Sequence, residues 1–562
     1  NCFDKDGKLD FEKLKQELSE NTEIEFSNES YSLDWLGKSY AIIRASDKAT
    51  TLLKEDEEWN NKPENRFSEN LLVKGDNLEV LKHLSNAYHE QIKMIYIDPP
   101  YNTGSDGFVY QDNRKFTADE LSKLAGVDSK EATRILEFTL KGSNSHSAWM
   151  TFMYPRLKIA HKMLKDDGVI FISIDDNEVT QLRLMLNLIF GEQNFVGEFA
   201  WRKTDNQANI GHLARVKEYV LCYSKLGSSF RLSKMELSDK AKKEYSYKDD
   251  KGNFRRGPLS HKTRARHSYD LTSPKGKVLS GPWMIREEEF HKLESVGSIY
   301  WTSGGKQLPY TKIYLEDSNG QIPSDWLGIE FGTNQRGSLE VEKLFGQRIF
   351  DFPKPTSLVK HFIKIGTNKD DIILDFFAGS GTTGDATMQL NSEDGGSRKC
   401  ILVQLPEIID PKKNKTAYNY VKDTLNVDEP TIFEITKERL VRAGKKIKEE
   451  NKTSKEPKDI SKVDFGFKIF ETVPIWENFD FEAIAFDPQT KLFNEDTLSE
   501  DRVKILLTTW KTRDGIPLTK GLEEISLDGY LGHYFEKSLY LVNKGFETKN
   551  LGKLLEEIDS NK

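Results

Sequence analysis

The fold of this chain is decided by one stretch, Lys93-Met-Ile-Tyr-Ile-Asp-Pro-Pro-Tyr-Asn102. Its apolar run, Met94 to Ile97, predicts a short strand that is buried on both faces. Strands of this kind belong to parallel α/β sheets, in which ligands bind beyond the carboxyl ends of the strands. The turn that follows, Asp98 to Tyr101, is predicted to be stiff, because each proline restricts its own φ and extends the residue before it. On its own, the turn is also compatible with a strand end and a capping aspartate.

The residues before this strand complete a strand–helix–strand unit. Leu71 to Val73 predict a short strand, and the apolar spacing from Leu78 to Leu84 predicts a helix. This order is typical of the βαβ units that build parallel sheets. Asp76 lies just before the helix, where it can cap the helix N-terminus or face a ligand at the end of the strand.

A second motif lies far along the chain and reads Asp371-Ile-Ile-Leu-Asp-Phe-Phe-Ala-Gly-Ser-Gly-Thr-Thr-Gly384. It predicts a strand at 372–374, a glycine-rich loop and a helix. Gly379 and Gly381 allow the backbone to approach a ligand closely, and the helix N-terminus favours an anionic group. The loop is not a P-loop, because no Gly-Lys-Ser/Thr follows it. The next buried strand ends in Gln404, where nucleotide-binding folds place a hydrogen-bonding partner for a ribose.

Further patterns predict the elements around these motifs. The segment 104–147 shows no strand pattern and is predicted to be a mobile insertion with one helix, near 130–140. The turn Asp175–Asn177 is predicted to cap a helix that ends at Phe190. The other predicted elements are helices at 11–18, 149–164 and 431–452, a helix that residues 352–357 open and that runs through 364, and strands at 168–174, 218–223 and 399–404.

The chain is predicted to contain five regions, since 562 residues exceed the size of one domain. Two α/β regions carry the motifs, a basic region without α/β rhythm separates them, and less regular regions lie at both ends. These regions are an N-terminal lead-in at 1–69, the first α/β part at 70–194, the insert at 195–345, the second α/β part at 346–450, and a C-terminal α+β domain at 451–562.

The charge of the chain is unevenly distributed. The net charge is −8, yet residues 201–280 hold 19 Lys and Arg against 8 Asp and Glu, whereas residues 451–562 hold 16 against 21. A basic block inside an acidic protein predicts a local site for a polyanion such as nucleic acid, although it can also be a solvated face. Aromatic residues alternate with the positive charges of this insert, among them Tyr245, Tyr247, Phe254, Tyr269, Trp283, Tyr300 and Trp301.

Composition excludes several classes of protein. No apolar run approaches the roughly 18 residues that span a bilayer, and no basic-then-apolar signal pattern is present. Because the chain starts with Asn1 rather than Met, we expect that its start has been trimmed. The three cysteines lack CxxC spacing, which favours a reducing cytoplasm and argues against a zinc site or disulfides, so no metal is expected.

The order of these motifs resembles the beta class of amino-methyltransferases that act on DNA bases. More specifically, the chain is similar to the modification (Mod) subunits of type III restriction–modification systems over roughly residues 30–450. One departure is Gln404, where related enzymes carry an acidic residue for the cofactor ribose; Glu407 can take its place. The strings that carry the resemblance are Leu72-Val-Lys-Gly-Asp-Asn77, Ile97-Asp-Pro-Pro-Tyr-Asn-Thr-Gly104, Phe152-Met-Tyr-Pro-Arg-Leu157, Gly168-Val-Ile-Phe-Ile-Ser-Ile-Asp-Asp-Asn-Glu178, Ile189-Phe-Gly-Glu-Gln-Asn-Phe195, Ile373-Leu-Asp-Phe-Phe-Ala-Gly-Ser-Gly-Thr-Thr-Gly384 and Ile401-Leu-Val-Gln-Leu-Pro-Glu407.

The resemblance implies a circularly permuted, Rossmann-like methyltransferase sheet with an inserted target-recognition domain and a C-terminal α+β domain. It implies transfer of a methyl group from S-adenosylmethionine to N6 of a flipped adenine. Asp98 and the Pro99 carbonyl would accept hydrogen bonds from the amino group, Pro100 would stiffen the turn and Tyr101 would stack on the base. An aspartate at position 98 favours adenine, since cytosine-N4 enzymes usually carry serine there. The implied cofactor residues are Asp76, Lys354, Asp375, Phe377, Ala378, Gly379, Ser380, Gly381, Thr382 and Gln404.

The resemblance also implies partners and a location. We expect double-stranded DNA as substrate, a homodimer, a helicase–endonuclease (Res) partner and the cytoplasm, without a membrane. Two alternatives remain at this stage: a stand-alone DNA adenine methyltransferase, and a DNA-reading subunit with a vestigial site. A nicotinamide-dependent oxidoreductase lacks support beyond the glycine pattern, and methylation of protein glutamine uses a motif that begins with Asn rather than Asp98.

Overall fold

The structure is a computed structural model that describes residues 33–104, 117–140, 144–207, 212–303, 307–476, 499–543 and 545–560. The predicted helix at 11–18 lies outside these residues. The chain divides into two compact units. The first unit contains Asn1–Lys48, Pro100–His161 and Ile174–Phe195, and the second contains Ala49–Pro99, Lys162–Ser173 and Val196–Lys562.

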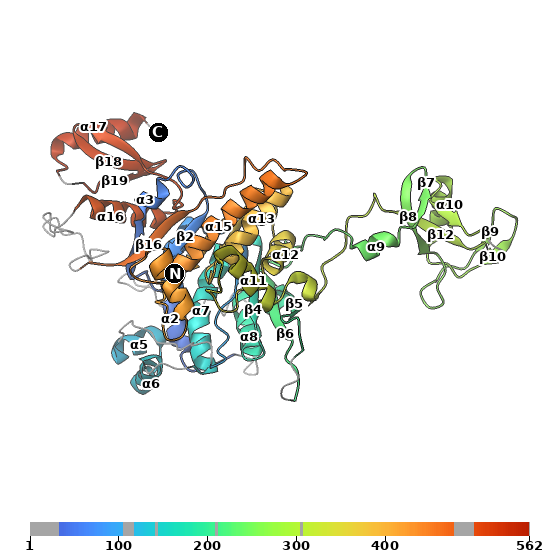
Figure 1. The fold of residues 1–562 in the computed structure, drawn as a ribbon, viewed down its shortest axis with the longest axis horizontal. Helices are drawn as coiled ribbons and strands as arrows, with labels where there is room; N and C mark the ends of the chain where they lie inside the picture. Colours follow the sequence, from blue (N-terminus) through green and yellow to red (C-terminus); the bar gives the residue numbers. More distant parts are fainter. Residues whose placement is uncertain are drawn as a thin grey trace, which may run out of the picture. The chain divides into compact units, whose positions relative to one another are not determined.

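The second unit is built on a ten-stranded sheet (Figure 1). Its central six strands run parallel, in the order β16-β2-β15-β14-β3-β4. They form because their residues are apolar: every residue of β3 is buried, as predicted for a two-sided strand. Along the sheet the strands are β1 (Thr51–Glu55), β16 (Lys468–Pro474), β2 (Leu71–Lys74), β15 (Lys399–Gln404), β14 (Ile372–Asp375), β3 (Ile92–Ile97), β4 (Leu164–Ile174), β6 (Lys217–Ser224), β5 (Phe195–Arg202) and β13 (Trp326–Leu327).

Helices cover the faces of this sheet. The crossover from β2 to β3 through α4 (Asn77–Ala87) and the crossover from β14 to β15 through α13 (Thr382–Asp394) run in opposite directions along the sheet. Right-handed crossovers therefore place the two helices on opposite faces. On one face, α12 (Thr356–Gly366) packs Phe362 against Phe171 of β4, with ring centroids 4.7 Å apart.

The strand order reverses between β14 and β3. From β14 the chain proceeds to β15 on one side, and from β3 it proceeds to β4 on the other side. The two strands pair in parallel, with Leu374 beside Ile95, so their carboxyl ends lie next to each other. Such a reversal opens the crevice in which α/β sheets bind ligands.

The edges of the sheet differ from the prediction. The lead-in, expected to be irregular, contributes β1, which pairs antiparallel with β16 from beyond the predicted boundary at 451. Strands β5, β6 and β13 also join the main sheet, although they lie in the 195–345 range. The sequence did not assign these strands to the main sheet, because pairing between distant segments leaves no local pattern in the sequence.

A smaller module within the 195–345 range has its own sheet. The strand order is β11 (Ile299–Trp301), β12 (Pro309–Tyr314), β8 (Gly252–Pro258) and β7 (Tyr247–Asp249), all antiparallel. A separate core that contains Phe290 of α10 (Glu287–Ser295) and Ile299 stabilises it, so the module has a hydrophobic centre of its own.

The C-terminal region begins with α16 (Glu500–Arg513), which packs on β1. The Leu53 amide donates to Thr509 Oγ1 at 2.9 Å, which ties this helix to the edge of the main sheet. A three-stranded antiparallel sheet and a last helix follow, confirming an α+β composition. They are β17 (Glu523–Leu527), β18 (Tyr530–Phe535), β19 (Ser538–Tyr540) and α17 (Thr548–Ser560).

The described part of the first unit is mainly helical. The insertion predicted to hold one helix contains two in its described part, because a capping box of Thr117 and Glu120 starts an additional short helix. The aspartate at 175 does not cap the following helix: the N-cap residue is Glu178, and the Asp175 carboxylate binds Asn177 instead. The helices are α2 (Lys38–Ser46), α5 (Ala118–Ala125), α6 (Ser129–Leu140), α7 (His146–Met163) and α8 (Val179–Phe190).

Candidate functional site

Asp98 lies directly after the buried strand β3, at the reversal of strand order. Its side chain is partly exposed, with a relative accessibility of 28%, and Oδ1 lies 3.0 Å from the ammonium of Lys354. The sequence prediction therefore has the right strand end, and the structure adds a cationic partner. A carboxylate held by an ammonium at the edge of a crevice is suited to accept hydrogen bonds.

Lys354 is buried and has two carboxylate neighbours. Its Nζ lies 3.0 Å from Asp98 and 3.4 Å from Oε2 of Glu218, and it stands 5.7 Å from the ring of Trp201. Burial alone would lower the pKa of Lys354, but the two carboxylates outweigh it and raise the pKa above its ordinary value. The ammonium that the sequence assigned to the cofactor thus contacts Asp98 and Glu218.

Asp375 ends the neighbouring strand β14 and is fully enclosed. Its carboxylate accepts hydrogen bonds from the Phe377 amide at 2.9 Å and from Thr383 Oγ1 at 2.5 Å. Burial raises the pKa of Asp375 to about 7, and the charge of Asp98 adds to the rise. Through these two hydrogen bonds, the buried Asp375 side chain fixes the conformation of the chain where the glycine-rich loop starts.

The glycine-rich loop has the backbone that its sequence predicts. Gly379 has a φ of 53° and Gly381 a φ of 85°, both in the left-handed region. A Cβ at Gly379 would fill open space, with Phe350 the nearest side chain at 3.5 Å, and Phe377 stays half-buried at the loop surface. Open backbone beside an aromatic ring fits a cofactor with a flat base and a ribose.

Arg439 of α15 (Ile432–Thr453) supports this loop from behind, and sequence reasoning missed it. The guanidinium is almost fully buried and donates to Ser380 Oγ at 2.6 Å, to Thr382 Oγ1 at 2.9 Å and to Asp385 at 3.1 Å. The hydroxyls of Ser380 and Thr382 are thereby directed toward the protein. In the sequence, Arg439 is one charge among many in a charged helix, so no local pattern distinguishes it.

The ends of β2 and β15 complete the edge of the crevice. Asp76 caps α4 by accepting from the Leu78 and Glu79 amides at 3.0 and 3.2 Å, which confirms the capping interpretation. Gln404 stays partly exposed at the end of β15, and its backbone oxygen accepts from the Gly75 amide at 3.1 Å. Glu407, the alternative ribose partner, is exposed.

Within the first unit, the residues after Pro99 are firmly held. Trp149 Nε1 donates to the Pro100 carbonyl at 2.7 Å. Two residues later, the Asn102 side chain donates to Glu178 at 2.7 Å, and His146 lies 2.8 Å from the same carboxylate oxygen. The stiffness predicted from two prolines is thus reinforced by an indole and by a buried carboxylate.

The small module presents positive charge among aromatic rings. The guanidinium of Arg256 on β8 lies 4.7 Å from the ring of Tyr247 and 5.0 Å from that of Tyr310. Lys312 stands opposite Arg256 in the strand register. Because Ile299 lies in the module's core while Tyr300 is 6.0 Å from Arg256, the two residues point to opposite faces of the sheet. The face of Arg256 and Tyr300 is the basic, aromatic one.

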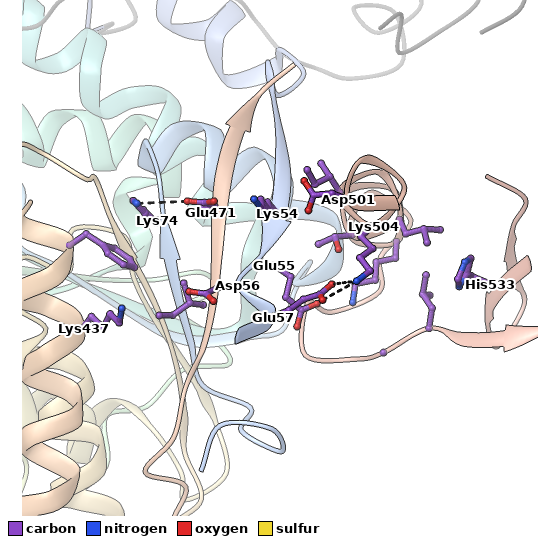
Figure 2. Close-up of a pocket in the computed structure, with 18 of the residues that line it drawn as sticks. Lys54, Glu55, Asp56, Glu57, Lys74, Lys437, Glu471, Asp501, Lys504 and His533 are labelled. Carbon is purple, nitrogen blue, oxygen red and sulfur yellow. Dashed lines mark hydrogen bonds and ion pairs between the residues drawn. The ribbon is translucent and has the colours of Figure 1, made fainter. Parts of the chain in front are cut away.

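A pocket of about 560 Å³ lies away from these residues, where α16 meets β1 and β16 (Figure 2). Its lining is charged, but the charges pair with each other: Lys504 lies 2.8 Å from Glu57, and Lys74 lies 3.7 Å from Glu471. Paired charges of both signs do not define a ligand, so the candidate site remains the crevice at the strand ends.

Neither a metal-ligand cluster nor a membrane-spanning helix occurs among the described residues. No group of three or more His, Cys, Asp and Glu side chains there could hold a metal ion. No helix within the described ranges has both the length and the apolar character that crossing a membrane requires.

Comparison with known proteins assigns the class to which this crevice belongs. Residues 92–407, which contain Asp98, Lys354 and the glycine-rich loop, match the family model described as DNA methylase. A second model, the type III R-M EcoP15I C-terminal domain, matches residues 501–562. The predicted class of DNA methyltransferase and its methyl donor, S-adenosylmethionine, are thereby confirmed.

Relatives over the whole chain give the particular family. The chain is 39% identical to the type III restriction–modification enzyme EcoPI Mod subunit of Escherichia phage P1 and to the EcoP15I Mod subunit of Escherichia coli, covering 100% of this chain and 89% of each relative. It is 34% identical to the StyLTI Mod subunit of Salmonella typhimurium over 98% of this chain and 87% of that protein. The chain belongs to the family of type III Mod subunits, as its motifs predicted.

Proposed function

We propose that this chain transfers a methyl group from S-adenosylmethionine to N6 of adenine in duplex DNA, as the modification and sequence-recognition subunit of a type III restriction–modification system. The observation that carries the proposal is the Asp98 carboxylate, held 3.0 Å from the buried Lys354 ammonium beside the glycine-rich loop. Family membership supports the reaction class, and the aspartate at 98 supports the choice of adenine.

The chemistry follows from hydrogen bonding. An exocyclic amino nitrogen is a poor nucleophile, because its lone pair is delocalised into the ring. The Asp98 carboxylate and the Pro99 carbonyl can each accept one N–H, which favours a pyramidal nitrogen with an available lone pair. Such catalysis works by orientation and electrostatics and needs no covalent enzyme intermediate. When bound, S-adenosylmethionine supplies an electrophilic methyl group on its sulfonium.

The cofactor residues are proposed from their positions. Phe377 and Gly379 are partly exposed at the loop surface, Ala378 is buried between them, and the Gly381 turn begins α13. Asp76 and Gln404 are proposed as polar contacts at the ends of β2 and β15. Ser380, Thr382 and Asp375 are proposed to act through the shape of the loop, because their side chains bind Arg439 or the loop itself.

Access to the base requires flipping. An adenine stacked in a duplex cannot reach a crevice at strand ends, and extruding it costs a few kcal/mol. Stacking on Tyr101, which follows the rigid Pro100, would return roughly 1–3 kcal/mol. Trp149 holds the Pro100 carbonyl at 2.7 Å, so the chain leading to Tyr101 is fixed before the base arrives.

Recognition of DNA is proposed for the small module. Arg256 can neutralise a phosphate, and Tyr247, Tyr300 and Tyr310 offer flat surfaces and hydroxyl groups for the sugar and base edges. Lys312 is already paired with Asp249 at 2.7 Å. The excess of positive charge in residues 201–280 agrees with this assignment.

The proposed partners follow the family. The named relatives are subunits of restriction–modification enzymes, which supports a Res partner for this chain. The match of residues 501–562 to a type III C-terminal domain favours this assignment over a stand-alone methyltransferase. We also propose a homodimer, a role of the C-terminal region in partner contact, and a cytoplasmic location, because the substrate is DNA. Co-purification with a helicase–nuclease subunit tests the partner.

Long-read methylation mapping of DNA from cells expressing the chain tests the reaction. The expected result is N6-methyladenine in one short, asymmetric motif, methylated on one strand, and its disappearance with Asp98→Ala. Methylation at cytosine N4 would overturn the adenine assignment. A wild-type chain that binds DNA and transfers no labelled methyl group would establish the vestigial-site alternative instead.

A further inference from the structure

Asp98 is the first of four charged side chains of alternating sign that contact one another in a row. Asp98 contacts Lys354 at 3.0 Å, Lys354 contacts Glu218 at 3.4 Å, and Glu218 contacts Lys203 at 3.1 Å. They come from four separate places in the chain: Asp98 follows β3, Lys354 lies two residues before α12, Glu218 is at the start of β6 and Lys203 follows β5. This charge row therefore connects the base-binding motif to the two strands that precede the small module.

The backbone of Lys354 cannot shift freely. Prolines flank it at 353 and 355, and its carbonyl accepts from Thr382 Oγ1 at 3.2 Å. A Cβ added to Gly337 would come within 2.2 Å of the Pro353 carbonyl, so α11 (Asn334–Phe345) packs directly against this segment. With the backbone fixed, the position of the ammonium depends on the side-chain contacts that hold it.

We propose that Glu218 is a positioning residue for methyl transfer: it holds the Lys354 ammonium in place and shares its charge, so that Asp98 keeps an oxygen oriented toward the target amino group. The inference rests on the proposed function of Asp98. Glu218 has a side-chain accessibility of 7%, as does Lys354, so water screens their interaction little. Without the second carboxylate, the Lys354 ammonium would interact with Asp98 alone and would change the orientation of the Asp98 carboxylate.

Glu218 also connects the charge row to the segment that contains the small module. Its other oxygen binds Lys203, whose backbone carbonyl accepts from the Asn334 amide at 2.8 Å. Residue 203 follows β5 and residue 334 begins α11, so the chain is fastened here on both sides of the 204–333 segment that contains the small module.

The test uses purified full-length chain, labelled S-adenosylmethionine and a duplex that contains the mapped motif. Glu218→Gln is expected to lower kcat by on the order of tenfold to a hundredfold, since small misplacements in a site have effects of that size. The KM for both substrates and the Kd for DNA should stay within about threefold. Glu218→Asp, which keeps the charge, should recover part of the lost kcat.

A double-mutant cycle isolates the proposed route. If Glu218 acts through Lys354, then Glu218→Gln causes no further loss of kcat in a Lys354→Met background. Independent, multiplying losses would overturn the proposal. Thermal unfolding of each variant identifies any chain that has lost its fold, and for such a chain the cycle is repeated with Glu218→Asp, where the same non-additivity is expected.

The pH profile of kcat gives a readout that a merely structural role would not change. Lys354→Met should move the acidic limb to higher pH, because Asp98 loses its cation, whereas Glu218→Gln should leave it in place or move it lower. Shifts in the same upward direction would contradict the proposal. The titratable or charged groups around Asp98 and Lys354 are Tyr96 on β3, Lys203 after β5, Glu218 on β6 and Asp375 on β14.

A matched control is available at the opposite edge of the sheet, where the strand β14 begins. Asp371 is also a buried carboxylate, 2.9 Å from the ammonium of Lys165, but it precedes β14 instead of following it. Asp371→Asn should lower stability and leave kcat and its pH profile unchanged. If the wild-type chain itself transfers no methyl group, the proposed function fails; if it does and Glu218→Gln matches it, only this inference fails.

Discussion

Two adjacent strands of the central sheet end in the same residue type, yet the two aspartates are built into different surroundings. Asp98 at the end of β3 is partly exposed and lies 3.0 Å from an ammonium. Asp375 at the end of β14 is enclosed and accepts from the Thr383 hydroxyl and the Phe377 amide. A strand end in this fold is thus suitable for chemistry or for loop construction, and the immediate partners decide which.

The difference also appears in the electrostatics. Burial raises the pKa of Asp375 to about 7, with the negative charge of Asp98 contributing. The ammonium of Lys354 lies 3.0 Å from Asp98, whereas the contacts described for Asp375 come from a hydroxyl and a backbone amide. Two neighbouring carboxylates therefore share one region with only one of them directly paired to a cation among the contacts described here, and the paired one is the proposed hydrogen-bond acceptor.

The largest effect is expected from removing Asp98, which is the partly exposed one of the two aspartates. Asp98→Ala should reduce methyl transfer by about a thousandfold or more, because the target amino group loses its charged hydrogen-bond acceptor. DNA binding should persist, since the proposed DNA-reading module is built from other residues. Transfer of labelled methyl groups and a DNA-binding titration measure both. Near-normal turnover of this variant would end the assigned role of Asp98.

The second largest effect concerns the loop that Asp375 begins. Arg439→Met leaves Asp385 buried without its partner, a change that typically costs about 3–5 kcal/mol. The free energy of unfolding, measured in urea, should fall accordingly, and the KM for S-adenosylmethionine should rise as Ser380 and Thr382 lose their donor. Lys446→Met on the same helix is the control, because its 3.8 Å pair with Glu450 is exposed. Equal losses in both variants would argue against the buried network.

The third effect is the pH dependence of stability that the buried Asp375 causes. The pKa of Asp375 rises from 3.8 to about 7 on folding, so between these values the folded chain holds a proton that the unfolded chain has released. Its contribution to stability is therefore complete below about pH 4, falls as pH rises, and is lost above about pH 7. The total change amounts to about 4 kcal/mol at most.

Asp375→Asn cannot titrate, so its stability relative to wild type should increase between pH 4 and pH 8. Urea unfolding of both chains at several pH values measures the difference, in which all other titrating groups cancel. A constant difference across this range would mean that Asp375 ionises as an ordinary carboxyl group.

The two strand ends were predictable from sequence because their signals are local. Consecutive apolar residues in β3 and β14, followed by an aspartate and by prolines or glycines, define both positions without knowledge of the rest of the chain. The helices that start with clear apolar spacing, such as α4 and α12, were predictable for the same reason.

The surroundings of the two aspartates were not predictable in the same way. Glu218 is the second residue of an otherwise apolar strand, and Arg439 is one charge in a charged helix, so neither stands out in the sequence. The edge strand β1 and its neighbour β16 have mixed burial, and they pair although they lie far apart along the chain. Contacts between distant segments require the assembled sheet, which explains why the partner of Asp98 became visible only in the structure.

The smallest effect is expected at Tyr101, which follows the Asp98 turn but belongs to the other compact unit. If its ring stacks on the flipped base, Tyr101→Ala should weaken base binding by roughly 1–3 kcal/mol and reduce turnover to match, whereas Tyr101→Phe should keep most activity because the stacking face remains. Fluorescence of a 2-aminopurine at the target position reports the flipped population directly. A Tyr101→Phe variant as inactive as Tyr101→Ala would show that the hydroxyl matters more than the ring and would contradict the stacking role of Tyr101.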